Sequence, residues 1–183
     1  MNIAVTADEV RTDFGLAGVV YFPWCMTPRH GPDARTEHLL GTVGLPDTKW
    51  FMPKASLRAD DYIGVPCWYG KWGTAPDECR NWLVLGMLAG ITLGLDPSSA
   101  TVYALGDGPA HMAYSPLYRD VGSLVCVLAQ FQNLQQALEE DDKNREERVD
   151  ALRDQITAFA PLPFADEESQ WHLAFEEVID GIG

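Results

Sequence analysis

Cysteine and histidine, the residues best suited to metal binding and nucleophilic catalysis, are few and scattered in this chain. The four cysteines stand at positions 25, 67, 79 and 126, and the four histidines at 30, 38, 111 and 172. Structural zinc sites usually take Cys or His ligands in close pairs, and zinc deaminases combine H-x-E with P-C-x-x-C. Neither spacing occurs, so we expect no metal site and no cofactor. A cysteine could meet His111 in space, but no local motif marks an activated thiol.

Motifs for phosphate binding and acid–base catalysis are also incomplete. "GKWGTAP" lacks both the leading glycine of a phosphate-binding loop and the Ser or Thr that should follow Lys71. No G-x-S-x-G elbow is present. Adjacent acids occur, but nothing in the sequence sets two carboxyl groups at the distance that glycoside hydrolysis needs. We therefore expect a protein that is not an enzyme, with a hydrolase as a remaining alternative.

The stretch "PCWYGKWGTAPDECRNWLVLG", residues 66–86, concentrates large aromatic residues next to acids. Protein interfaces favour aromatic residues at the positions that contribute most to affinity. We predict a partner-binding surface in and just before this stretch, made by three aromatic residues and four acids: Trp68, Tyr69, Trp72, Asp60, Asp61, Asp77 and Glu78. The alternative is that these rings cover the edge of the core, since large aromatic residues are buried on average.

Charge limits the choice of partner. Twenty-seven acids face thirteen Lys and Arg, so the formal net charge is -14. Residues 132–183 hold fourteen of these acids and four bases, which gives -10 for that segment. Nucleic-acid binding needs a basic face, whereas an acidic protein is attracted to a basic partner or is simply soluble. We expect a basic protein partner and no nucleic acid.

Hydrophobic patterning favours a cytoplasmic location, which we expect for this protein. No apolar run approaches the 18 or so residues needed to cross a bilayer, and the first residues carry acids where a secretory signal has bases. We expect no membrane contact. In the cytoplasm the cysteines would remain reduced.

The central part of the chain predicts an antiparallel meander. "NWLVLGM", "AGITLGLD" and "ATVYALG" are apolar runs of strand length, and Asp96 begins a "DPSS" turn between the last two. Before them, a short helix capped by Asp33 would pass through Leu39 and Leu40 and stop at Gly41 or Gly44.

The last third predicts three helices. Apolar residues fall three and four positions apart, first from Val121 to Leu138 and then from Val149 to Phe159. Pro161 ends the second helix, and Asp166 is the expected cap of the third. We expect one buried core, to which five residues of the first two helices and the third helix's Trp171 contribute: Leu124, Leu128, Phe131, Leu152, Ile156 and Trp171. The fold class is α+β, a central antiparallel β-sheet flanked by helices in one domain over 1–183.

Three segments in this order, "LLGTVGLP", "LVLGMLAGITLGLDPSSATVYAL" and "FADEESQWHLAFEEVIDG", resemble the fourth group of the SUKH superfamily of bacterial immunity proteins over residues 36–183. The sequence departs from that group at Ala100, where a turn glycine is usual. It also lacks the Asn-Ser-Ser helix cap, for which Asp120 is the candidate replacement.

The resemblance implies a non-enzymatic protein that binds and neutralises a cognate polymorphic toxin, often a nuclease or a nucleic-acid deaminase. It carries no catalytic residues, and it gives Gly44, Leu45, Pro46 and Asp96 scaffold roles. The alternative is an interaction or scaffold module of the same fold without a toxin partner.

Overall fold

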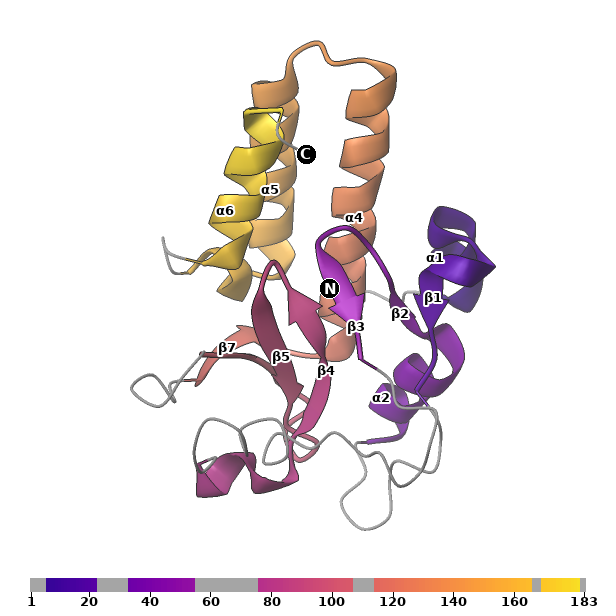
Figure 1. Cartoon of the computed structure of the whole chain (residues 1–183), viewed down its shortest axis with the longest axis vertical. Helices are drawn as coiled ribbons and strands as arrows, with labels where there is room; N and C mark the ends of the chain where they lie inside the picture. Colours follow the sequence, from indigo (N-terminus) through magenta and orange to yellow (C-terminus); the bar gives the residue numbers. More distant parts are fainter. Residues whose placement is uncertain (1–5, 23–32, 55–75, 107–113, 166–168, 182–183) are drawn as a thin grey trace.

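The computed structural model describes residues 6–22, 33–54, 76–106, 114–165 and 169–181 (Figure 1). A five-stranded antiparallel sheet lies at the centre, with a helical layer made by the last third of the chain and a smaller helical and two-stranded unit made by the amino-terminal part. This confirms the predicted α+β class.

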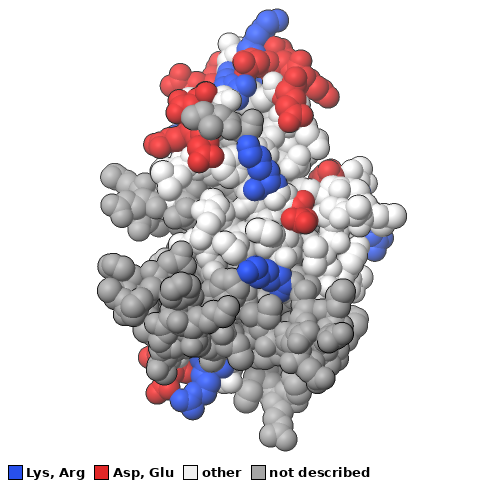
Figure 2. All heavy atoms as spheres, in the orientation of Figure 1, with Lys and Arg blue, Asp and Glu red and all other residues white. Residues whose placement is uncertain are grey.

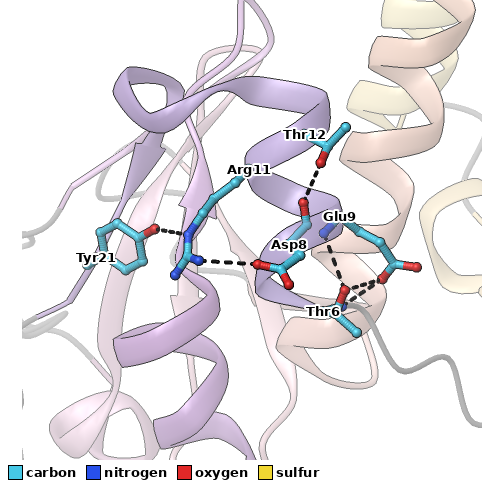
Figure 3. Close-up of polar contacts among 6 residues, drawn as sticks. All are labelled: Thr6, Asp8, Glu9, Arg11, Thr12 and Tyr21. Carbon is cyan, nitrogen blue, oxygen red and sulfur yellow. Dashed lines mark hydrogen bonds and ion pairs between the residues drawn. The ribbon is translucent and has the colours of Figure 1, made fainter.

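The amino-terminal part contains short elements, in chain order α1 (Ala7–Phe14), η1 (Leu16–Gly18), β1 (Val19–Val20), α2 (Ala34–His38), the π-helical turn η3 (Leu39–Val43) and β2 (Leu45–Pro46). Helix α1 was not predicted. Its first turn is closed by a reciprocal pair of contacts, in which Thr6 Oγ1 accepts from the Glu9 backbone N–H and the Glu9 carboxylate accepts from the Thr6 backbone N–H (Figure 3). Arg11 then links the helix to the segment after β1 by donating from Nε to the Tyr21 hydroxyl, 3.3 Å away.

Gly44 ends the α2–η3 segment and explains why a glycine stands there. The Asp33 carboxylate caps α2 by accepting from the Arg35 and Thr36 backbone N–H groups, as predicted. Gly44 has φ +83°, and a Cβ at this position would lie 2.4 Å from Val19 Cγ1. Strand β1 can therefore pair with β2 only because residue 44 has no side chain.

The sheet has the order β3-β4-β5-β6-β7 and is antiparallel throughout. Its strands are β3 (Phe51–Pro53), β4 (Leu83–Leu88), β5 (Ile91–Leu95), β6 (Val102–Leu105) and β7 (Tyr114–Tyr118), and the short helix η5 (Asp77–Asn81) precedes β4. Strands β4, β5 and β6 are the predicted meander. Asp96 forms the predicted turn by accepting from the Ser98 backbone N–H at 2.9 Å and from the Ser99 hydroxyl at 2.8 Å.

The carboxy-terminal third contains the three predicted helices α4 (Val121–Glu140), α5 (Arg145–Phe159) and α6 (Gln170–Ile179), with the short η6 (Leu162–Phe164) between the last two. Asp120 caps α4 by accepting from the Ser123 backbone N–H. The prediction of Asp166 as the cap of α6 was wrong. Helix α6 begins at Gln170, and the Ser169 hydroxyl accepts from the His172 backbone N–H in the capping position; Asp166 itself lies outside the described residues.

One face of the sheet packs against these helices. The predicted core positions Leu124, Leu128, Phe131, Leu152 and Ile156 are all buried. Trp171 has no exposed surface. Its ring lies 5.1 Å from that of Phe131, and its indole N–H donates to the Tyr118 hydroxyl of β7. This hydrogen bond joins the third helix to an edge strand of the sheet.

Candidate partner-binding surface

The outer face of the sheet, opposite the helices, carries its own small apolar cluster. Side chains alternate between the two faces of a strand, and in β6 the residues Val102 and Ala104 join the helical core while Tyr103 and Leu105 point the other way. Cys79 and Trp82, from η5 and the residue after it, pack on this second side. We call the group the outer cluster; its members are Cys79, Trp82, Val84, Tyr103, Leu105 and Tyr114.

Three rings of the outer cluster contact one another. Trp82 stacks on Tyr103 with a centroid distance of 4.2 Å and an interplanar angle of 21°. Tyr114 meets Trp82 edge-on at 4.9 Å and Tyr103 edge-on at 5.5 Å. Trp82 is buried, whereas both tyrosines are half-buried. The tryptophan is thus the base of the cluster, and the two tyrosines are its accessible part.

Asp77 and Glu78 flank this cluster from η5. Both are exposed, and Asp77 forms an ion pair with Arg80 at 2.6 Å. Within the described part of the chain, the Glu78 carboxylate has no hydrogen bond or ion pair. Its charge nevertheless acts on its neighbours. Burial, Glu78 and Asp96 together raise the pKa of the Cys79 thiol to about 11, and partial burial followed by Glu78 raises the pKa of Tyr114.

Two of the seven predicted surface residues, Asp77 and Glu78, therefore lie on η5, the helix that contributes Cys79 to the outer cluster. The other five, Asp60, Asp61, Trp68, Tyr69 and Trp72, lie outside the described residues. The sequence reasoning did not select the aromatic residues that the structure places beside the two acids. Tyr103 could have been found from its alternation with Val102 and Ala104, but Tyr114 belongs to a strand that was not predicted.

A second acidic surface lies at the far end of the helical layer. Figure 2 shows acidic side chains gathered where α4, α5 and α6 meet. We call this surface the acidic end, and its carboxylates are Glu139, Glu140, Asp141, Asp142, Glu146, Glu147, Glu176, Glu177 and Asp180. The helix η5 lies at the opposite end of the molecule's long axis (Figure 1).

Two arginines at the acidic end donate hydrogen bonds to backbone carbonyls. Arg145 donates to the Val178 carbonyl at 2.7 Å and pairs with Asp142. Arg148 donates to the Asp141 carbonyl at 2.7 Å. The Val178 carbonyl lies in the last turn of α6, and the Asp141 carbonyl belongs to the residue that ends α4. Within the residues that the structure describes, Asp142 alone among the carboxylates of the acidic end forms an ion pair, so most of this negative charge is uncompensated.

The described residues offer little that could hold a cofactor. They contain no group of three His, Cys, Asp or Glu side chains placed to bind a metal ion. A shallow cavity of about 90 Å³ opens at the acidic end, between Leu138, Arg145 and Val178. Cofactor sites usually measure about 300 Å³ or more, so this cavity suits water rather than an organic group.

Comparison with protein families shows which family the chain belongs to. The family model of the SUKH-4 immunity protein matches residues 5–177. The chain belongs to this family. No curated protein and no solved structure matches the chain.

The SUKH-4 match begins well before residue 36, where the sequence resemblance began, and therefore includes α1, β1 and α2. Positions of the SUKH-4 pattern have structural roles in this protein. Gly44 allows the approach of β1, Leu45 is fully buried, and Asp96 closes the β5–β6 turn. Ala100, where the pattern often has glycine, takes φ +61°, a backbone conformation that glycine adopts more easily.

Membership of the SUKH-4 immunity protein family indicates a role in immunity to a toxin. Among the helices of the described residues, none combines the length and the apolar character needed to span a bilayer.

Proposed function

We propose that this SUKH-4 protein binds a cognate bacterial toxin directly and neutralises it without catalysing a reaction. The observation that carries the proposal is the family match over residues 5–177. An immunity protein has to act in the compartment where the toxin meets its substrate. For a toxin that attacks nucleic acid, a nuclease or a nucleic-acid deaminase, this compartment is the cytoplasm.

The charge of the chain supports a toxin of this class. A domain that acts on nucleic acid presents basic residues to phosphate groups. An inhibitor with a formal net charge of -14 complements such a surface, and long-range attraction between opposite charges raises the rate of encounter. The same charge would repel nucleic acid from the immunity protein itself. Binding would then block the toxin's substrate groove.

The test is co-expression with the toxin domain encoded by the neighbouring gene. We expect the intact chain to restore growth and to bind the purified toxin domain tightly in a titration. The association rate should fall as salt rises to physiological strength, where screening limits electrostatic interactions to about 8 Å. The dissociation rate should change less.

A second toxin domain of similar positive charge from an unrelated gene is the control, because it tests whether charge alone is sufficient. We expect it neither to bind tightly nor to be neutralised. If the intact chain failed to bind or rescue against its neighbouring toxin domain, the proposal would be wrong, and a scaffold module without a toxin partner would be the better interpretation.

A further inference from the structure

The outer cluster has a polar composition that packing alone does not require. Two tyrosines hold its accessible positions, and among the described residues neither phenol hydroxyl has a hydrogen-bond partner. Phenylalanine would cover the core equally well, because covering it needs no hydroxyl. Together with Glu78, which makes no hydrogen bond or ion pair within the described part of the chain, the two hydroxyls leave several hydrogen-bonding groups open to a partner.

The rings are held in place before any partner arrives. Strands β5, β6 and β7 carry the cluster on a continuous hydrogen-bonded ladder. Gly94 of β5 lies under Leu105, and a Cβ at position 94 would come within 3.0 Å of Leu105 Cδ1. The missing side chain lets Leu105 lie flat against the sheet, beneath the aromatic residues. Such preorganisation reduces the conformational entropy that binding would otherwise lose.

The electrostatic character of the cluster selects a cation. Arg80 is paired with Asp77, so no ion pair among the described residues compensates the Glu78 charge. A planar guanidinium can stack on a tyrosine ring while it donates to a carboxylate, which an ammonium does less well. Such a side chain needs a carboxylate near an aromatic ring, and Glu78 lies near enough to Tyr114 to act on it electrostatically.

We infer that the outer cluster, with Asp77 and Glu78, is the surface that docks an arginine-bearing segment of the toxin. This inference rests on the proposed function. Charge complementarity identifies the occupant: a basic toxin supplies arginines, and the cluster offers carboxylates next to open aromatic rings. The acidic end has more charge, but the aromatic residues of the outer cluster are not part of it. It contributes long-range attraction, whereas the outer cluster contributes short-range contacts.

Two charge reversals separate these contributions. Glu78→Lys and Glu140→Lys change the net charge equally, and both positions are exposed, so both variants should fold. With the neighbouring toxin domain as the probe, Glu78→Lys should weaken binding about thirtyfold or more, mainly through faster dissociation. Glu140→Lys should change affinity less than about threefold, mainly through slower association.

Hydrogen exchange provides a second measurement that needs no variant. In the complex, backbone protection should increase over 77–82 and 114–118, while 139–147 should change little. Sedimentation of the free chain tests the other occupant, a second copy of this protein. Self-association that protects 77–82 and 114–118 without toxin would overturn the inference.

The outcomes distinguish the inference from the proposed function. If the intact chain binds and rescues, but Glu78→Lys stays within threefold of it, the outer cluster is not the docking surface and the immunity function stands. If the intact chain neither binds nor rescues, both fall together.

Discussion

Aromatic rings pack on both faces of the five-stranded sheet, and the two groups of rings differ in their surroundings. On the helical face, Trp171, Phe131 and Phe175 have no more than 1% of their surface exposed. The polar atom of Trp171 is paired inside the core, with the Tyr118 hydroxyl. On the outer face, Tyr103 and Tyr114 are half-buried and keep their hydroxyls unpaired within the described part of the chain.

The contacts between the rings do not explain this difference. Phe131 and Trp171 meet edge-on at 5.1 Å, and Trp82 and Tyr114 meet edge-on at 4.9 Å. Both arrangements are favourable for aromatic pairs. What separates the two groups of rings is their exposure. The rings of the helical face are buried, although the Trp50 indole N–H in the same core has no hydrogen-bond partner among the described residues. The outer tyrosines are half-buried. The helical face is closed to solvent and serves stability, while the outer face is partly open and is the surface that we propose for binding.

The largest expected effect is on the helical face. Trp171→Ala would remove a fully buried side chain that contacts Phe131 and Tyr118. We expect the free energy of unfolding to fall by about 3 to 5 kcal/mol, a large share of a typical domain's stability. Denaturant titration measures it, with Leu173→Ala as the control, because Leu173 is 49% exposed on the same helix. An unchanged midpoint for Trp171→Ala would contradict the description of a helical face that is buried and closed to solvent.

A smaller effect should follow from removing one oxygen on that face. Tyr118→Phe leaves the Trp171 indole N–H buried without its acceptor. Leaving a buried donor unpaired costs about 1 to 3 kcal/mol. The double variant Tyr118→Phe/Trp171→Phe is the control, because it removes both partners. Together with the two single variants it forms a double-mutant cycle. A coupling energy near zero in that cycle would show that the hydrogen bond does not stabilise the fold.

Much of the helical face could be predicted from the sequence because it depends on periodicity. The spacing of three and four residues in α4 and α5 identified the buried positions, and alternation together with turn residues identified β4, β5 and β6. Helix α1 was missed, since it has one buried residue, Val10, and its first turn depends on a contact between Thr6 and Glu9. The cap of α6 was misplaced because Asp166 and Ser169 are both good capping residues, and local preference does not choose between them.

The outer face could be predicted only in part. The acids Asp77 and Glu78 were selected because they follow an aromatic stretch, but Tyr114 is distant from them in sequence. Strand β7 has two exposed residues, Ser115 and Pro116, so its pattern does not resemble a buried strand. Strand β7 lies beside β6 because the two strands pair across the sheet, and no local sequence pattern indicates this pairing.

Tyr114→Ala tests the outer face on the same scale. The ring is half-buried and contacts Trp82 and Tyr103 edge-on. Its loss should lower the free energy of unfolding by about 1 to 2 kcal/mol, less than that of Trp171, because part of the area is already in water. Denaturant titration gives the value. A loss as large as that for Trp171→Ala would mean that the outer cluster is a second core and not an open surface.

The smallest expected effect lies at the β5–β6 turn, next to the outer cluster. Burial alone would raise the pKa of the Asp96 carboxyl, but hydrogen bonds from Ser98 and Ser99 outweigh it, and the pKa is lowered in the folded protein. A lowered pKa means that the charged form is preferred on folding. The contribution of the Asp96 carboxylate to stability is therefore present above the unfolded pKa of about 3.9, and it is lost as the pH falls through the lower pKa of the folded protein.

Asp96→Asn keeps the size and one acceptor oxygen but removes this charge. We expect the variant to be less stable by about 0.5 to 1 kcal/mol at pH 7, and the difference from the intact chain to shrink as the pH falls below about 4. Urea titrations of both proteins from pH 7 to pH 3 measure it. Ser99→Ala at pH 7 is the control, because it removes one donor to Asp96 and leaves the charge. A difference that stays constant across this range would show that the turn depends on the shape of residue 96 and not on its charge. The Asp96 charge beside the outer cluster would then be available to a partner without cost to the stability of the fold.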